Sequence, residues 1–175
     1  LGDVQERVGD LDLAEKYYEA AIGLKSNYLD ALYTYGWFSY SIRPDVGKME
    51  HSFRKMVEAD DHDFRGFHGL GYALYMRAIK ESNAAVRRKL IIEAALQTER
   101  ASNLKIRQLN VVVDFGEIAR LVDADLAIRY HKHAHSVLDD PLMSQLPANR
   151  GTLGIKLLMS PGYLGIKSME EKRAL

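Results

Sequence analysis

Apolar residues recur at every third or fourth position along the first part of the chain. The clearest run consists of Leu11, Ala14, Tyr18, Ala21 and Leu24. This spacing places apolar side chains on one face of an α-helix, whereas a half-buried β-strand alternates apolar and polar positions. Alternation of the strand type is largely missing before residue 140, so the pattern predicts an all-α structure there.

Proline and glycine divide the chain into two parts. No proline lies between Pro44 and Pro141, and no glycine lies between Gly71 and Gly116, whereas three prolines and four glycines crowd the last 35 residues. Because proline interrupts the hydrogen-bond ladder of a helix, long stretches without it are typical of helical regions. We expect a helical domain over residues 1–140, followed by a C-terminal capping segment or linker over residues 141–175.

Pairs of a large and a small residue recur at a regular interval. Tyr35-Gly36 follows Leu1-Gly2 after 34 residues, and Leu70-Gly71 follows after a further 35. Residues 10–21 also have an echo at residues 123–134, at a shift of 113. Each pair lies in one amphipathic helix and a second such helix follows it, which indicates a two-helix unit repeated along the chain.

This arrangement resembles the tetratricopeptide repeat family, in which a unit of about 34 residues forms two antiparallel helices. The family has a large-then-small pair in the first helix and small, aromatic and small residues in the second. The first unit matches through Leu1, Gly2, Gly9, Ala14, Tyr18 and Ala21. The second and third units match through Tyr35, Gly36 and Phe53, and through Leu70, Gly71, Ile92 and Ala95. The fourth unit matches mainly in its second helix.

The chain departs from the family pattern in two respects. The proline that follows the second helix is absent, and Ser26, Asp61 and Asp139 stand in its place. The interval from Gly71 to Phe115 is 44 residues, so we expect longer helices or a longer turn in the third unit.

The resemblance implies an α-solenoid of about four antiparallel hairpins. A single helical hairpin cannot cover its own apolar face, so successive hairpins stack and share a continuous core. Gly36 and Gly71 are expected to let neighbouring helices approach closely. Leu1-Gly2 stands midway through a first helix, and residues 168–171 have the spacing of a capping box. Both ends therefore look like cuts within a longer protein.

The C-terminal segment repeats a tetrapeptide. LGIK occurs at residues 153–156 and 164–167, on either side of Pro161-Gly162, a dipeptide suited to a tight turn. A short hairpin and an irregular cap are the two alternatives for this segment.

Composition narrows the classes of function. Acidic and basic side chains balance at 24 each, so there is no overall positive charge of the kind that nucleic-acid binders show. No run is apolar enough for a membrane helix, and we expect no membrane insertion. Cysteine is absent, which excludes thiolate zinc sites and cysteine nucleophiles. The compartment stays open, with the cytoplasm favoured.

The resemblance also implies a binding surface. In the family, certain first-helix positions line the inner, concave wall of the superhelix. The matching positions of units two and three hold Tyr33, Trp37, Tyr40, Arg65, His68, Tyr72 and Tyr75. Aromatic rings with polar tips give much contact area at small entropic cost, as a peptide groove requires. The alternative is that some of them, Trp37 and Tyr72 above all, pack in the core.

A known use of this fold, in which lysines and asparagines hold the C-terminal carboxylate of a chaperone, does not suit this chain. The equivalent positions of the first unit hold Asp3 and Glu6, which would repel a carboxylate, and only Arg65 is suitably basic. The mixed surface instead favours an extended peptide or a folded protein as partner.

Three further clusters favour structural roles. His131 and His135 lie four residues apart and would share a helix face, but no acidic residue is placed as in a helical zinc site, so we expect no metal or other cofactor. Residues 60–63 read Asp-Asp-His-Asp but lack the glycine and distal glutamate of a calcium loop, which favours a solvated turn. Acidic pairs such as Asp10 and Asp12 suit helix starts.

No catalytic motif emerges from the sequence. A phosphate-binding glycine loop, a GxSxG elbow and a convincing nucleophile–base pair are all missing. The first hypothesis is therefore a non-enzymatic module that binds a peptide or protein partner and that can also form homo-oligomers through exposed terminal faces. The alternative is the substrate-docking repeat region of a larger enzyme such as a glycosyltransferase or kinase. A third hypothesis is a metal-responsive switch through the histidine run.

Overall fold

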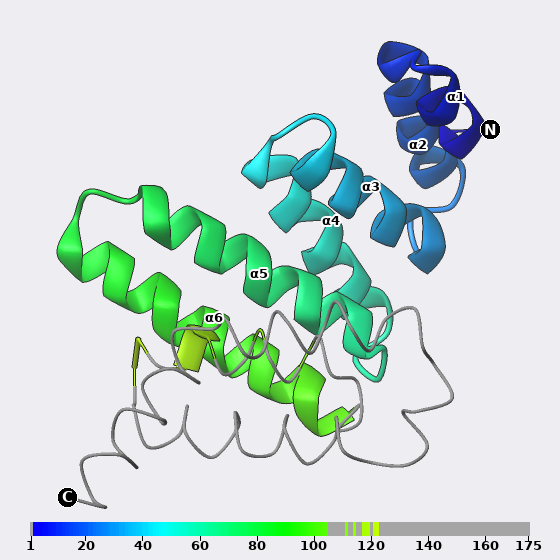
Figure 1. Cartoon of the computed structure of the whole chain (residues 1–175). Helices are drawn as coiled ribbons and strands as arrows, with labels where there is room; N and C mark the ends of the chain where they lie inside the picture. The colour runs from blue at the N-terminus through cyan, green and yellow to red at the C-terminus, as the bar shows by residue number, and fades with distance from the viewer. Residues whose placement is uncertain (1, 105–110, 112–113, 115–116, 120, 123–175) are drawn as a thin grey trace, which may run out of the picture.

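The computed structural model describes residues 2–104 together with residues 111, 114, 117–119, 121 and 122. Within residues 2–104 all regular elements are α-helices, which confirms the predicted all-α fold class (Figure 1). The helices are α1 (Gly2–Val8), α2 (Leu11–Leu24), α3 (Leu29–Ser41), α4 (Val46–Ala59), α5 (Phe64–Lys80) and α6 (Ala84–Leu104). The segment 141–175 and most of the expected fourth hairpin lie outside the described residues.

Aspartate side chains start three of the helices. Asp10, Asp45 and Asp63 precede α2, α4 and α5, and their carboxylates accept hydrogen bonds from backbone N–H groups of the first turn at 2.9–3.1 Å. These N-caps satisfy donors that the helix itself leaves unpaired. The expectation that acidic residues mark helix starts is therefore confirmed at Asp10 and in the 60–63 turn.

The helices form three consecutive hairpins. The pairs α1–α2, α3–α4 and α5–α6 pack within a hairpin, while α2–α3 and α4–α5 contacts join one hairpin to the next. The first helices of the second and third hairpins, α3 and α5, also touch directly. Figure 1 shows the hairpins stacked in chain order, with the N-terminal hairpin at one end. The apolar face of each hairpin thus forms part of a shared core.

The glycines of the repeated pairs face the second helix of their own hairpin. A β-carbon built on Gly2 would lie 2.5 Å from the ring of Tyr18, and one on Gly36 would lie 2.7 Å from the ring of Phe53. A β-carbon on Gly71 would overlap the methyl group of Thr98. The predicted close approach of the helices at Gly36 and Gly71 is confirmed.

The register of the third hairpin differs from the expected one. The α6 residues that face α5 are Ala94, Thr98 and Ala101, each fully buried, whereas Ile92 is 39% exposed. The expected match through Ile92 is therefore wrong, whereas Ala95, the other expected match on this helix, is buried. The reason is the length of the hairpin: α5 has 17 residues and α6 has 21, and both extend past the neighbouring hairpin before they meet at the turn. Longer helices in this unit were expected, and the structure confirms them.

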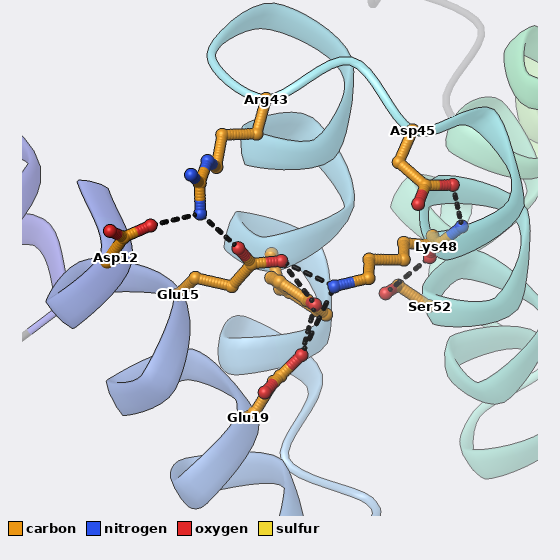
Figure 2. A network of polar contacts seen from close by, with 8 residues as sticks. Asp12, Glu15, Glu19, Arg43, Asp45, Lys48 and Ser52 are labelled. Carbon is orange, nitrogen blue, oxygen red and sulfur yellow. Dashed lines mark hydrogen bonds and ion pairs between the residues drawn. The ribbon is translucent and has the colours of Figure 1, made fainter.

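Ion pairs join successive hairpins. Glu15 of α2 accepts hydrogen bonds from Lys48 Nζ at 2.6 Å and from Arg43 at 2.8 Å, as Figure 2 shows. Glu50 of α4 binds Arg54 of the same helix and Arg77 of α5. The hydrogen bond from Lys48, assisted by Arg43 and opposed by burial, lowers the pKa of Glu15. Burial raises the pKa of Glu50, but the two arginines outweigh it and the pKa is lowered.

No helix among the described residues combines the length and the apolar character that a bilayer crossing requires.

Candidate functional site

Five aromatic side chains from two consecutive hairpins form one continuous surface, which we call the aromatic wall: Tyr33, Trp37, Tyr40, Tyr72 and Tyr75. The first three come from α3, where their spacing of four and three residues gives them a common face. The last two come from α5. Direct contact between α3 and α5 brings the two groups together.

Trp37 is the centre of the aromatic wall. Its ring lies 6.3 Å from Tyr33, 5.8 Å from Tyr40 and 5.9 Å from Tyr72, as measured between centroids. The first two contacts are edge-to-face, a favourable geometry for aromatic pairs. Trp37 Nε1 is buried and has no hydrogen-bond partner among the described residues.

The two tyrosines that face each other across α3 and α5 are hydrogen-bonded. The hydroxyl oxygens of Tyr40 and Tyr72 lie 3.1 Å apart, and their rings pack edge-to-face with centroids 5.2 Å apart. Burial, followed by the hydrogen bond with Tyr40, raises the pKa of Tyr72. The Tyr72 hydroxyl therefore stays protonated at neutral pH and is an uncharged hydrogen-bonding group. Tyr75 continues the row beyond Tyr72 at 6.2 Å.

The aromatic wall also covers the core. All five rings are half-buried and pack against the core cluster, and Trp37 lies 5.4 Å from the fully buried ring of Phe53. The two interpretations of these residues, as groove or as core, are thus not exclusive. Each ring has an inner edge that packs inward and an outer part that stays accessible.

Arg65 is bound at the edge of the aromatic wall. Its guanidinium forms a fork with the carboxylate of Asp63, contacts Asp30 Oδ1 at 2.9 Å, and lies 5.3 Å from the ring centre of Tyr33. The hydrogen bonds with Asp63 raise the pKa of Arg65, together with those of Asp30 and against the effect of burial. The positive charge is already matched by two carboxylates, so Arg65 offers little attraction to an incoming anion.

His68 lies beneath the aromatic wall. It is 5% exposed, its ring centre is 5.9 Å from that of Trp37, and its Nε2 lies 2.9 Å from Asp114 Oδ2. His68 thus lies next to the other predicted residues, but its Nε2 faces Asp114. Its position supports Trp37 from the inside.

Two carboxylates of the first hairpin are held together by a tyrosine that the sequence pattern assigned only to the core. The hydroxyl of Tyr18 donates to Asp3 at 2.7 Å and lies 3.0 Å from Glu6. Asp30 is a further acidic residue next to the site that the sequence pattern did not select. Asp30 could have been selected from the sequence, because it lies three residues before Tyr33 on the same helix.

The other candidate clusters have structural roles where the structure describes them. Asp63 caps α5, and Asp60 Oδ1 accepts a hydrogen bond from the N–H of His62 at 2.9 Å. Among the described residues only Asp60, Asp61 and His62 converge closely enough to share a metal ion. The expected turn and helix cap are present: Asp61 and His62 form an exposed turn, and Asp63 precedes α5 as its N-cap. The run of His131, His133 and His135 lies outside the described residues.

Solved structures share this stack of hairpins. TTC0263, a thermophilic TPR protein of Thermus thermophilus, superposes with a TM-score of 0.68 over 94% of this chain and 81% of its own, at 18% identity. MamA superposes with a TM-score of 0.67 over 99% and 96% of the two chains, at 19% identity. The chain has the tetratricopeptide repeat fold.

A third tetratricopeptide repeat structure is similar over most of its length. YrrB, described as a TPR protein with an unusual peptide-binding site, superposes with a TM-score of 0.60 over 95% of this chain and 88% of its own, at 16% identity. No protein-family model matches the chain. No curated protein sequence matches it either.

Proposed function

We propose that this tetratricopeptide repeat protein is a non-enzymatic interaction module that binds an extended peptide or protein segment over the aromatic wall. The observation that carries the proposal is the continuity of five half-buried rings across two hairpins. Rigid rings with accessible outer parts contribute large contact area without a large loss of side-chain entropy, which is typical of binding hot spots.

The charges around the aromatic wall indicate which peptides it favours. Arg65 is paired with two carboxylates, those of Asp63 and Asp30, so the negative charge is in excess at this edge of the wall. Cations are attracted both by carboxylates and by aromatic faces. We therefore expect apolar, proline and basic side chains to bind better than a free carboxylate. A peptide-binding site in YrrB is in keeping with this use of the fold.

The polar clusters described above support a non-enzymatic role. They are accounted for as helix caps and as ion pairs between hairpins. The alternative, a substrate-docking region of a larger enzyme, would use the same surface, and no feature of the described residues favours it over a free-standing module.

Trp37 provides a direct test because it is the only tryptophan in the chain. Short peptides selected from a displayed random library are titrated into the protein while its fluorescence is recorded. We expect peptides that bind the aromatic wall to change the Trp37 emission, and Tyr40→Ala to weaken their binding at least about tenfold. Tyr28→Ala is the matched control, since Tyr28 is 46% exposed and lies outside the wall. Binding that leaves the emission unchanged and is insensitive to Tyr40→Ala would contradict the proposal.

A further inference from the structure

A groove lies on a different face of α3 from the aromatic wall. The helices α2 and α4 flank a hollow of about 540 Å³, and α3 forms its floor through Leu32 and Tyr35. A helix turns by about 100° per residue, so Leu32 and Tyr35 point away from the side that carries Trp37. We call this hollow the α2–α4 groove. Its volume falls within the roughly 300–1,000 Å³ that is usual for ligand sites.

Small residues keep the α2–α4 groove open. Gly23 at the end of α2 and Gly47 in the first turn of α4 both line it. A β-carbon built on Gly23 would meet no atom within 4 Å, so the space beside it is empty. A β-carbon built on Gly47 would lie 3.2 Å from Asp45 Oδ1, so Gly23 is the position with free space for a larger side chain. The groove is therefore open because α2 and α4 have glycines, and not larger residues, where they line it.

The floor of the groove is apolar. Leu32 is 1% exposed, Tyr35 is 6% exposed, and Ile22 is partly buried beside them. The hydroxyl of Tyr35 is already bonded to Glu15 and Glu19. An apolar side chain that entered the hollow would therefore meet hydrocarbon and ring surface without leaving a buried polar group unpaired.

The rim on α4 is basic. Lys48, His51 and Lys55 line it at spacings of three and four residues, which places them on one face of the helix. Figure 2 shows Lys48 joined to Glu15 and Glu19, so this lysine is neutralised. His51 and Lys55 form no hydrogen bond or ion pair with any residue that the structure describes. An unmatched ammonium and an exposed imidazole thus stand beside the apolar floor.

We propose that the α2–α4 groove binds an acidic protein segment that inserts an apolar side chain between α2 and α4. The apolar anchor packs on Ile22, Leu32 and Tyr35, while neighbouring Asp or Glu residues of the partner face Lys55 and His51. Charge complementarity favours an acidic partner, because Glu19, the acidic residue among the described residues that line the groove, is already paired with Lys48. This partner differs in charge from the one expected at the aromatic wall, and the two sites are independent.

The test selects short peptides from a displayed random library on the wild-type protein and counter-selects on Gly23→Leu, in which the added side chain occupies the hollow. We expect enrichment of sequences with a large apolar residue flanked by Asp or Glu. Their affinity is then measured by fluorescence anisotropy against variants. Lys55→Glu is expected to weaken binding at least about tenfold, whereas Lys80→Glu, an exposed basic residue outside the groove, leaves it unchanged.

A variant of the aromatic wall separates this proposal from the proposed function. Tyr40→Ala is expected to leave binding of the acidic peptides unchanged. If no peptide binds the aromatic wall of the wild-type protein while acidic peptides still bind the groove, only the proposed function is overturned. Enrichment of basic sequences, absence of any enrichment, or affinity that survives Lys55→Glu would overturn the groove proposal. Circular dichroism confirms folding of each variant, and Lys55→Glu decides the matter if Gly23→Leu does not fold.

Discussion

Gly36 and Phe53 are in such close contact that a β-carbon on the glycine would lie 2.7 Å from the ring. Phe53 is fully buried, and its ring also packs edge-to-face on the rings of Trp37 and Tyr33. The missing side chain of Gly36 therefore leaves the space in which the Phe53 ring packs beneath the aromatic wall. A change at Gly36 acts on the hairpin first and on the wall through Phe53.

Gly36→Ala is expected to destabilise the protein by roughly 1–3 kcal/mol, because an enclosed ring cannot move aside for the extra methyl group. Gly23→Ala is the matched control. It also replaces a helical glycine, but in open space, so the gain in helix propensity is expected to stabilise the protein by up to about 1 kcal/mol. Urea unfolding of both variants measures the difference. Equal stability of the two alanine variants would show that the close approach at Gly36 is unimportant.

Trp37→Ala is expected to lower the free energy of unfolding by roughly 2–4 kcal/mol, since the indole packs on Phe53 as well as on the wall. Trp37→Phe keeps most of that packing and is expected to lose about 1 kcal/mol or less. Binding by the wall should be compared in the phenylalanine variant, which stays folded. If Trp37→Ala is as stable as the wild type, the contact with Phe53 contributes little, and Trp37 is a surface residue only.

The fold was largely predictable from the sequence, whereas the details of the site were not. The close approaches at Gly36 and Gly71 could be predicted, because the large-small pairs repeat at a regular spacing. The register of α6 could not be predicted, because this helix has apolar residues on more than one side and its sequence does not show where the extra length lies. The burial of His68 was equally hidden: its partner Asp114 is 46 residues away, and a sequence shows no pairing at that distance.

Acid is expected to destabilise the protein by protonating carboxylates that are paired with cations in the folded chain. The pKa values of Glu15, Glu50 and Asp63 are lowered in the folded chain below their ordinary values of 4.5, 4.5 and 3.8. Groups whose pKa is depressed by folding contribute stability above their unfolded pKa and lose it as the pH falls through the folded one. Urea unfolding should therefore show constant stability down to about pH 5 and a progressive loss below it.

Glu50→Gln tests the origin of that loss. Glu50 is 8% exposed and joins α4 to Arg77 of α5, so its neutral amide is expected to lower stability at neutral pH by roughly 1–2 kcal/mol, with the exposed arginines screened by solvent. The variant should also lose less stability in acid than the wild type. An unchanged acid profile would assign the loss to other carboxylates.

Self-association is expected at the first hairpin, which exposes large apolar side chains. Leu24 is 91% exposed, Val8 74% and Val4 55%. Uncovered apolar surface favours association. Light scattering should show a rise in mean mass with concentration for the wild-type chain and a smaller rise for Leu24→Glu. Val86→Glu on α6, an exposed valine outside that hairpin, is the control. A constant monomer mass at high concentration would contradict this expectation.

The register of the third hairpin can be tested by two substitutions on neighbouring turns of α6. Thr98 is fully buried against Gly71, so Thr98→Leu would force a larger side chain into a space that is already full and is expected to cost roughly 1–3 kcal/mol. Ile92 is 39% exposed, and Ile92→Ser should change stability by about 1 kcal/mol or less. Urea unfolding of the two variants would give the reverse order if α6 were turned so that Ile92 faced Gly71, because the serine would then leave a cavity and Thr98 would lie at the surface.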